Sequence, residues 1–361
     1  MTNILFVDGT RNFSPTRLGN EPAGGIVTSL TLIPQYLAKK GMNVFVKSAH
    51  TEAVELNGVK YIHLDSTAPM PRFDVVVFNR NLINNFNYTQ VVEIGATPIW
   101  WLHDIVDHRN MEDASFLKIQ NIVSLSRYCT ETYSDFYGIP RDRFTVIGNG
   151  VDKSVWYPGK YAHREKGYFV MASAPIKGFK PMPFTWEQMR RNRTKLRLEI
   201  YSSQSLHGLE NSEQAQAWLT WMSDNGCVVK EPIPQKELAD VFRKAWALLM
   251  PNDYPEICSN LMLQARACGL PVVTSPIGSA PEVIEDCVNG FITRWHPHDK
   301  FAWWKEFAQK TLETVTRPEI HEVVSEHAPK GIKSWDEIGE EWFAYVTRIQ
   351  NKKNRKLVSL L

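Results

Sequence analysis

A helix start in the second half of the chain has the residue types of an anion-binding site. In the stretch PNDYPEICSNLMLQARACGLP (251–271), Ser259 or Asn260 is a suitable N-cap for the apolar helix that follows, and Gly269 is a typical end residue. The first backbone amides of such a helix are free to bind an anion. We therefore expect ligand contacts from the residues of this turn, which are Cys258, Ser259, Asn260 and Leu261.

Two oxygen-bearing side chains frame that helix start. Glu256 precedes it, where a carboxylate suits the hydroxyls of a neutral polyol, such as a sugar ring, better than it suits an anion. Gln264 follows further along, at a distance of about 12 Å if each residue adds ~1.5 Å of helical rise, which is the reach of a nucleotide's ribose. A buried amide that is bonded to protein is the structural alternative for Gln264.

Two loops that contain glycine could approach phosphate groups. The stretch EPAGGIVTSL (21–30) places Gly24 and Gly25 at a helix start, where paired glycines let backbone amides reach a ligand. The stretch SAPIKGF (173–179) places Lys177 after a strand, where an ammonium can neutralise a diphosphate. Neither is G-x-G-x-x-G or a Walker loop. A plain helix start and a solvated surface lysine are the structural alternatives.

A histidine and an aspartate end a buried strand in WWLHDIVDH (100–108). The pair is His103 and Asp104, and ligands bind at the carboxyl ends of parallel strands in α/β sheets. Histidine can accept hydrogen bonds or shuttle protons near neutral pH. A hydrogen-bonded structural histidine is the alternative. A metal site that adds Asp107 and His108 lacks a recurring ligand spacing, so we expect no metal.

The order of apolar runs predicts an α/β fold with two Rossmann-like, doubly wound domains. Continuous Val/Ile/Leu runs alternate with helical stretches, as in parallel sheets that are buried on both faces. The predicted strands are 3–8, 43–48, 74–79, 97–104, 121–126 and 144–150, then 167–173, 196–203, 227–231, 245–251 and 270–275. The charged residues 153–166 are interpreted as a linker. Two such halves around a central cleft, with one ligand in each, suggest a transfer enzyme.

Composition limits the classes of function. The chain has 361 residues, with 41 basic and 39 acidic side chains and a net charge of +2, so no strong field attracts nucleic acid. Five cysteines without a C-x-x-C pair favour a reducing compartment. The N-terminal MTNILFVDGT is interpreted as a strand and not as a signal peptide, and no run approaches the ~20 apolar residues of a membrane span. A cytoplasmic protein is therefore expected.

The C-terminal tail RIQNKKNRKLVSLL is basic and then apolar. We interpret it as a solvated helix end. Weak association with an anionic membrane surface, which would make the protein peripheral to a membrane, is the alternative.

In their order and spacing, the motifs of this chain resemble those of family 4 of the glycosyltransferases, which are retaining enzymes of the GT-B fold. The match covers nearly the whole chain and comprises AGGI, HD, SLSRYCTETY, VIGNGVD, IKG, PEICSNLMLQARACGLPVV, GSAPEVI, NGF and SWDEIGEEW. The resemblance implies a GT-B architecture, a nucleotide-diphosphate sugar as donor, and an acceptor hydroxyl on a glycan, a glycolipid or a small molecule.

The resemblance also implies a role for each candidate residue. Glu256 matches the first glutamate of the family's E-x7-E signature, which holds the donor sugar. Gln264 takes the place of the second glutamate, which binds the ribose. Lys177 matches the lysine on the diphosphate, and His103 matches the histidine that faces the reacting sugar. Gly25 matches the glycine near the phosphates.

The chain departs from the family pattern at two places. Gln264 stands where the family has a glutamate, and Ser173, Ala174 and Pro175 stand where it has an arginine shortly before the lysine. One cation fewer weakens the stabilisation of the leaving group. The departures leave open a slow enzyme, an enzyme whose positive charge comes from elsewhere, or a non-catalytic nucleotide-sugar-binding subunit. An epimerase on the same fold is a further alternative.

The sequence as a whole predicts a metal-independent, retaining glycosyltransferase of carbohydrate biosynthesis that needs no cofactor. Residues 1–160 would bind a carbohydrate or lipid-linked acceptor, residues 161–335 would bind the donor, and a C-terminal helix over 336–361 would cross back to the N-terminal domain. The expected catalytic residues are His103, Lys177 and Glu256. The expected donor-binding residues are Gly25, Ser173, Lys177, Glu256, Cys258, Ser259, Asn260, Leu261 and Gln264. The expected acceptor-side residues are Gly24, His103 and Asp104.

Overall fold

The chain folds as two α/β units in a computed structural model, which describes residues 1–8, 14–19, 21–48, 53–80, 88–106, 117–175, 177–191, 195–203, 210–296 and 298–358. Unit 1 comprises Met1–Leu18, Gly25–Gly150 and Lys333–Leu361, and unit 2 comprises Gly19–Gly24 and Val151–Ile332. The main division therefore follows Gly150, ten residues before the boundary that the sequence suggested at 160.

Within the described part of unit 1, eight strands form one sheet in the order β3-β4-β2-β1-β5-β6-β7-β8. Its strands are β1 Asn3–Asp8, β2 Asn43–Ser48, β3 Val54–Leu56, β4 Val59–His63, β5 Val75–Asn79, β6 Thr97–Trp101, β7 Ile122–Ser124 and β8 Phe144–Val146. All neighbours are parallel except β3 and β4. This edge hairpin was not predicted from the sequence, because exposed charges at Glu55 and Lys60 interrupt its apolar pattern.

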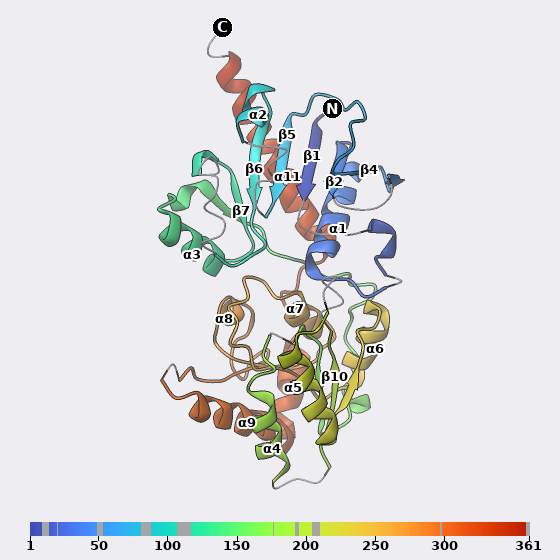
Figure 1. Cartoon of the computed structure of the whole chain (residues 1–361), viewed down its shortest axis with the longest axis vertical. Helices are drawn as coiled ribbons and strands as arrows, with labels where there is room; N and C mark the ends of the chain where they lie inside the picture. The colour runs from blue at the N-terminus through green and yellow to red at the C-terminus, as the bar shows by residue number, and fades with distance from the viewer. Residues whose placement is uncertain are drawn as a thin grey trace. The chain divides into compact units, whose positions relative to one another are not determined.

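Helix α11 (Trp335–Val358) packs on the unit 1 sheet, where β1, β2, β5 and β6 lie side by side (Figure 1). The Trp342 ring lies 4.8 Å from that of Trp101 and 6.1 Å from that of Phe6. A Cβ at Gly339 would lie only 2.3 Å from the Tyr36 ring on α1, so a glycine is needed for this close approach. The other helices of unit 1 are α1 Gly25–Lys39, α2 Tyr88–Glu93 and α3 Arg127–Tyr137, with short 3-10 turns at Pro15–Arg17 and Arg141–Arg143.

The described residues of unit 2 form a six-stranded, all-parallel sheet in the order β11-β10-β9-β12-β13-β14. The strands are β9 Tyr168–Met171, β10 Arg197–Tyr201, β11 Val228–Lys230, β12 Ala247–Met250, β13 Val272–Thr274 and β14 Phe291–Ile292. Side chains of β9 alternate between two hydrophobic clusters, with Phe169 and Met171 in one and Tyr168 and Val170 in the other. Both faces are therefore buried, as the continuous apolar runs predicted. Strand β14 was not predicted from the sequence, because it has only two residues.

The helices of unit 2 surround this sheet. They are α4 Met182–Arg190, α5 Glu213–Asp224, α6 Gln235–Lys244, α7 Asn260–Ala267, α8 Ala280–Val283, α9 Lys300–Thr316 and α10 Pro318–His327, with a 3-10 turn at Tyr161–His163.

The interpretation of residues 153–166 as a linker is wrong. Trp156 is fully buried in a hydrophobic cluster of unit 2, and Arg164 is buried as well. The Arg164 guanidinium donates hydrogen bonds to the carbonyl oxygens of Phe242, Ala245 and Cys268 at 3.0, 2.7 and 2.8 Å. A charged, proline-containing stretch was taken for a solvated connection, whereas its arginine satisfies buried carbonyls and its tryptophan fills the core.

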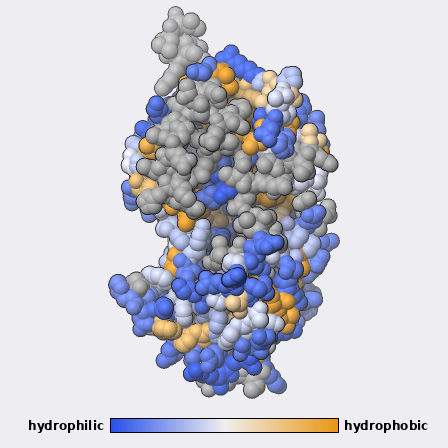
Figure 2. Space-filling view, viewed as in Figure 1, coloured by the Kyte–Doolittle hydropathy of each residue, from blue (hydrophilic) through white to orange (hydrophobic). Residues whose placement is uncertain are grey.

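None of the helices described here is long and apolar enough to cross a membrane. The coloured residues on the face shown in Figure 2 are mostly hydrophilic, with apolar side chains scattered among them.

Candidate functional site

Lys177 and Glu256 meet at the carboxyl edge of the unit 2 sheet. β9 and β12 are parallel neighbours, so the loops that follow them leave the sheet at the same edge. The Lys177 Nζ lies 2.8 Å from Oε1 of Glu256, and the two side chains are 26% and 13% exposed. The Tyr254 ring faces the same ammonium, with 5.1 Å between Nζ and the ring centroid. The structure thus places a cation, a carboxylate and an aromatic ring together.

Short backbone contacts fix the loop that carries Lys177. Its amide donates to the Ala174 carbonyl at 2.9 Å, and the Ser173 hydroxyl donates to the Lys177 carbonyl at 3.1 Å. Gly178 has a φ of +82°, and a Cβ there would lie 3.0 Å from the Pro251 carbonyl oxygen in the loop after β12. This close approach needs a glycine, and it brings the loop after β9 against the loop that leads to Glu256. Ser173, expected to bind the donor, is thus seen to position Lys177.

The Glu256 backbone is held by the loop after β13. The Ser279 amide donates to the Glu256 carbonyl at 2.7 Å. Gly278 has a φ of +65°, and a Cβ there would lie 2.3 Å from the Glu256 carbonyl oxygen. The stretch GSAPEVI, which entered the sequence analysis only through a family resemblance, therefore supports the backbone of Glu256.

The start of α7 has the cap that the sequence predicted. Ser259 is the N-cap, and its hydroxyl accepts from the Met262 amide at 3.5 Å. No described residue accepts a hydrogen bond from the backbone amides of Ser259, Asn260 or Leu261. Cys258 and Leu261 are half-buried. This capped helix end with free amides lies three residues after Glu256, the partner of Lys177, and is an electropositive position that suits an anion.

Asn252 is a buried polar residue beside this site that the sequence analysis did not single out. It is 3% exposed, and neither heteroatom of its amide has a hydrogen-bond partner among the described residues. The Asn260 Oδ1 is likewise buried without a partner in the part of the chain that the structure describes. Buried polar groups are normally paired, so these amides mark the α7 end of the sheet as a polar site.

Gln264 is half-buried, and its side chain has no hydrogen bond to any described residue. The alternative that it is a buried amide bonded to protein is therefore not supported. The predicted spacing also needs correction, because residues 256–259 are not helical and α7 begins only at Asn260. The predicted rise of about 12 Å from Glu256 to Gln264 assumed a continuous helix, whereas only the part from Asn260 to Gln264 is helical and rises about 6 Å, at ~1.5 Å per residue.

In unit 1, His103 and Asp104 follow β6, as the sequence predicted. The His103 ring lies 4.3 Å from the Trp101 ring, and its Nε2 is buried with no partner among the described residues. Burial lowers the pKa of His103 to about 3, and the positive charge of Arg80 acts in the same direction. The imidazole is therefore neutral at physiological pH. A neutral histidine with a free nitrogen can accept or donate a hydrogen bond without adding charge.

Arg80 is a residue of this group that the sequence analysis missed. It follows β5 and has a φ of +69°, which is uncommon for a residue with a side chain. Its Nε donates to Oδ2 of Asp104 at 2.5 Å, and the Tyr133 hydroxyl donates to the Asp104 carbonyl at 3.1 Å. Asp104 is thus the partner of a cation within unit 1. Asp107 and His108 lie outside the described residues, and no metal-binding cluster occurs within them.

Gly25 opens α1, as predicted. Gly24 groups with unit 2, and a Cβ at Gly24 would meet no atom within 4 Å. The glycine is therefore not required by the packing of the described residues. A role of Gly24 and Gly25 near a ligand stays a prediction.

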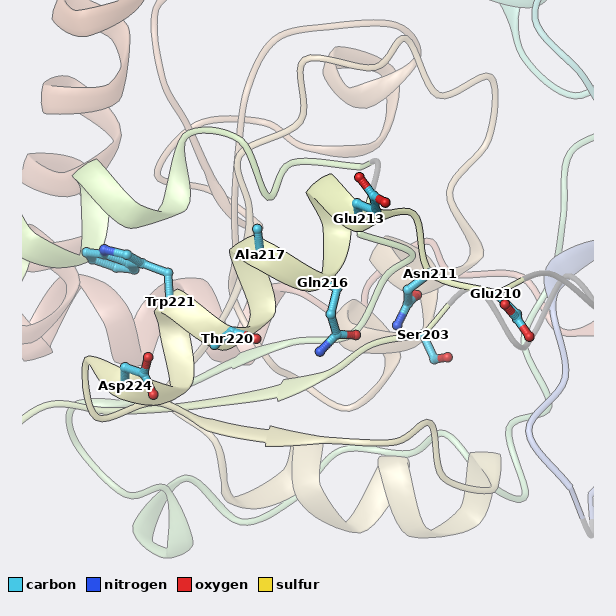
Figure 3. A pocket seen from close by; sticks show the side chains of 9 residues that line it. All are labelled: Ser203, Glu210, Asn211, Glu213, Gln216, Ala217, Thr220, Trp221 and Asp224. Atoms are coloured by element: carbon cyan, nitrogen blue, oxygen red, sulfur yellow. The ribbon is translucent and has the colours of Figure 1, made fainter.

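A large pocket of unit 2 lies along α5 and contains none of the predicted site residues (Figure 3). Its volume is about 980 Å³, and it is lined by Ser203, Glu210, Asn211, Glu213, Gln216, Ala217, Thr220, Trp221 and Asp224. Three of these residues are acidic and none of the described lining residues is basic. A diphosphate would meet like charge there, so the Lys177–Glu256 pair is the better candidate for an anionic ligand.

Sequence comparison relates part of the chain to known proteins. Residues 157–313 match the family described as Glycosyl transferases group 1. A D-inositol 3-phosphate glycosyltransferase from Kribbella flavida is 27% identical over 207 residues, which cover 53% of this chain and 48% of that protein. The chain spans about half the length of the curated relatives that it matches.

Solved structures share the fold over nearly the whole chain. The sucrose-phosphate synthase from Thermosynechococcus elongatus is 13% identical and superposes with a TM-score of 0.71 over 100% of both chains. HepE from Anabaena, solved in complex with UDP-glucose, is 14% identical and has a TM-score of 0.68, covering 96% of this chain and 100% of that one. Identities this low establish the fold alone, and the predicted GT-B fold is confirmed.

Proposed function

We propose, from the premise that this chain is a GT-B protein of the group 1 glycosyl transferases, that it moves a sugar from a nucleotide-diphosphate sugar to an acceptor hydroxyl. The observation that carries the proposal is the Lys177–Glu256 pair beside the capped start of α7. A cation and free helix amides suit a diphosphate, and a carboxylate suits sugar hydroxyls. HepE, which shares the fold, binds UDP-glucose, and this supports a nucleotide sugar as donor.

In the proposed reaction, Lys177 and the first amides of α7 bind the diphosphate and stabilise the charge that develops on it. Glu256 accepts hydrogen bonds from the donor sugar, and Gln264 contacts the ribose. The bond between the anomeric carbon and the diphosphate oxygen breaks, and a bond from that carbon to the acceptor oxygen forms. The acceptor's proton passes to the departing diphosphate, so no separate base is needed. Contacts to the nucleobase of the donor would come from residues 229–234.

The acceptor side is proposed to lie in unit 1. His103 is neutral and its Nε2 has no partner among the described residues, which suits a hydrogen bond to a hydroxyl. We propose Asp104 as a further acceptor-side residue of unit 1, and Gly24 stays a predicted acceptor-side residue although it groups with unit 2. The inositol phosphate glycosyltransferases among the relatives support a small polyol or a sugar as acceptor, and a lipid-linked carbohydrate stays the alternative.

The transfer is proposed to retain the anomeric configuration and to need neither a metal nor a cofactor. The charged groups of the site support metal independence, because Lys177 supplies the positive charge that a metal would otherwise bring. Arg266 on α7 does not replace the family's missing arginine, since its guanidinium bonds the carbonyls of Ala328, Val283 and Lys330 at 2.7–2.9 Å. Turnover should therefore be slow but persist in excess EDTA, and a complete loss that manganese restores would contradict metal independence.

We place the protein in the cytoplasm, and association of its C-terminal tail with an anionic membrane surface stays a prediction. Most of that tail's side chains lie outside the described residues. Nucleic acid is not among the proposed partners.

The function is tested in two steps. Thermal shift and calorimetry with UDP-, GDP- and ADP-sugars identify the donor, because binding raises apparent stability. A turnover assay with the wild type and Glu256→Ala then separates an enzyme from a binding subunit. We expect sugar transfer in the wild type and a strong loss in Glu256→Ala with the fold intact. Binding without any turnover would instead favour the non-catalytic subunit, which the missing arginine and Gln264 permit.

A further inference from the structure

The Lys177–Glu256 ion pair sets a condition on the ligands that the site accepts. The two charged groups are 2.8 Å apart, and both side chains are mostly buried. The proposed function requires Lys177 to bind a diphosphate and Glu256 to bind sugar hydroxyls. A ligand must therefore compete with Glu256 for the ammonium, and it must also leave the carboxylate with new partners.

Two kinds of ligand meet this condition differently. A nucleoside diphosphate takes Lys177 but offers no hydroxyl to Glu256 at the sugar position, so a partly buried carboxylate is left beside a polyanion. Breaking a partly exposed ion pair while one of its charges stays unsatisfied costs free energy. A nucleotide sugar brings the same diphosphate together with hydroxyls that donate to the carboxylate, which offsets the loss.

From this geometry we propose that the Lys177–Glu256 pair makes the site selective for the intact nucleotide sugar over the nucleoside diphosphate. The inference rests on the proposed function and deepens it. It gives Glu256 a second role, since the carboxylate also weakens the binding of the product that is left after the sugar has been transferred.

Tyr254 helps to hold the Lys177 ammonium in place, so the charge of Glu256 alone can be removed to test the inference. Its ring lies 5.1 Å from the Lys177 Nζ, and an aromatic face attracts an ammonium. The contacts of Gly178 and of the Ser173 hydroxyl hold the loop independently of Glu256. The ammonium is therefore expected to keep its place when Glu256 is replaced by the isosteric, uncharged glutamine.

The experiment measures dissociation constants by calorimetry for Glu256→Gln and the wild type. The ligands are whichever of UDP, GDP and ADP the wild type binds, and the matching nucleotide glucose. Glu256→Gln should bind the nucleoside diphosphate roughly fivefold tighter, the worth of a partly exposed ion pair, and the nucleotide sugar no tighter than the wild type. In Lys177→Met/Glu256→Gln the gain should disappear, because no ammonium is left to be released.

A matched control removes another ion-paired carboxylate of unit 2. Glu187 on α4 pairs with Arg191 at 3.1 Å on the surface, so Glu187→Gln should leave both dissociation constants unchanged. Unchanged or weaker diphosphate binding in Glu256→Gln would overturn the inference. So would an equal gain in Glu187→Gln, or a gain that persists in the double variant. A wild type that binds none of these ligands would overturn the proposed function and the inference together.

Discussion

Gly278→Ala should damage the candidate site through the backbone of Glu256, without touching any ligand. Gly278 has a φ of +65°, and an added Cβ would lie 2.3 Å from the Glu256 carbonyl oxygen and 2.7 Å from its amide nitrogen. Real Cβ atoms essentially never come closer than 3.0 Å to such atoms. Both contacts are with backbone, so no flexible side chain can move aside.

The magnitude follows from the size of the clash. The Glu256 backbone must retreat by about 0.7 Å to reach a contact of 3.0 Å. A misplacement of about 1 Å can cost a factor of ~100 in rate, so we expect kcat to fall by roughly ten- to a hundredfold. The left-handed backbone adds a stability cost of ~1–2 kcal/mol for a residue that carries a Cβ.

Gly331→Ala is the matched control. Gly331 also lies in unit 2 and has a φ of +75°, but a Cβ there would meet nothing within 4 Å. Both variants share the cost of the left-handed backbone, and only Gly278→Ala displaces Glu256. Denaturant unfolding should show a loss of stability in both variants, larger in Gly278→Ala because of its clash, and steady-state kinetics should show a loss of kcat in Gly278→Ala alone. Full activity of Gly278→Ala, or an equal loss in Gly331→Ala, would show that the Glu256 backbone is not what Gly278 protects.

Three further predictions concern single side chains. Lys177→Ala should weaken binding of a nucleoside diphosphate by roughly 1.5–3 kcal/mol, the worth of a charged hydrogen bond, and leave the bare nucleoside unaffected; equal losses would mean that Lys177 does not touch phosphate. Gln264→Ala should weaken ribonucleotide binding by about 0.5–1.5 kcal/mol and abolish discrimination against the 2′,3′-dideoxy analogue, and a variant that still discriminates would remove Gln264 from the ribose site. Burial lowers the pKa of His321, which stacks on Trp246, to about 3, so this histidine is neutral in the fold and gains a proton on unfolding below pH ~6.5. The free energy of unfolding should therefore fall as the pH drops from about 6.5 toward 3, and it should fall less steeply in His321→Gln. Urea titrations between pH 7 and 4 measure the pH dependence of stability in the wild type and in the variant. Equal slopes in the two proteins would argue that His321 is not the neutral, buried group responsible.

Most of the strands and the start of α7 could be predicted from the amino-acid sequence alone. Continuous apolar runs indicate strands buried on both faces, and a serine before an apolar helix indicates an N-cap. These are local signals, because both the spacing of apolar residues and helix capping depend on residues close together in the chain. The same logic placed Lys177 and Glu256 after strands, and the rule that ligands bind at carboxyl strand ends then suggested one site.

The contacts of these residues, by contrast, depend on the tertiary fold. No local pattern shows that the Lys177 ammonium pairs with Glu256 or that Tyr254 faces it, because the strand order β9-β12 brings their loops together. For the same reason, the sequence did not show that Gly278 lies against the Glu256 backbone. Arg164 shows the converse, since a charge that is typical of a solvated linker is buried among carbonyls from distant parts of the chain. The type of a side chain limits the groups that it can bind, whereas the fold determines which of these groups lies within hydrogen-bonding distance.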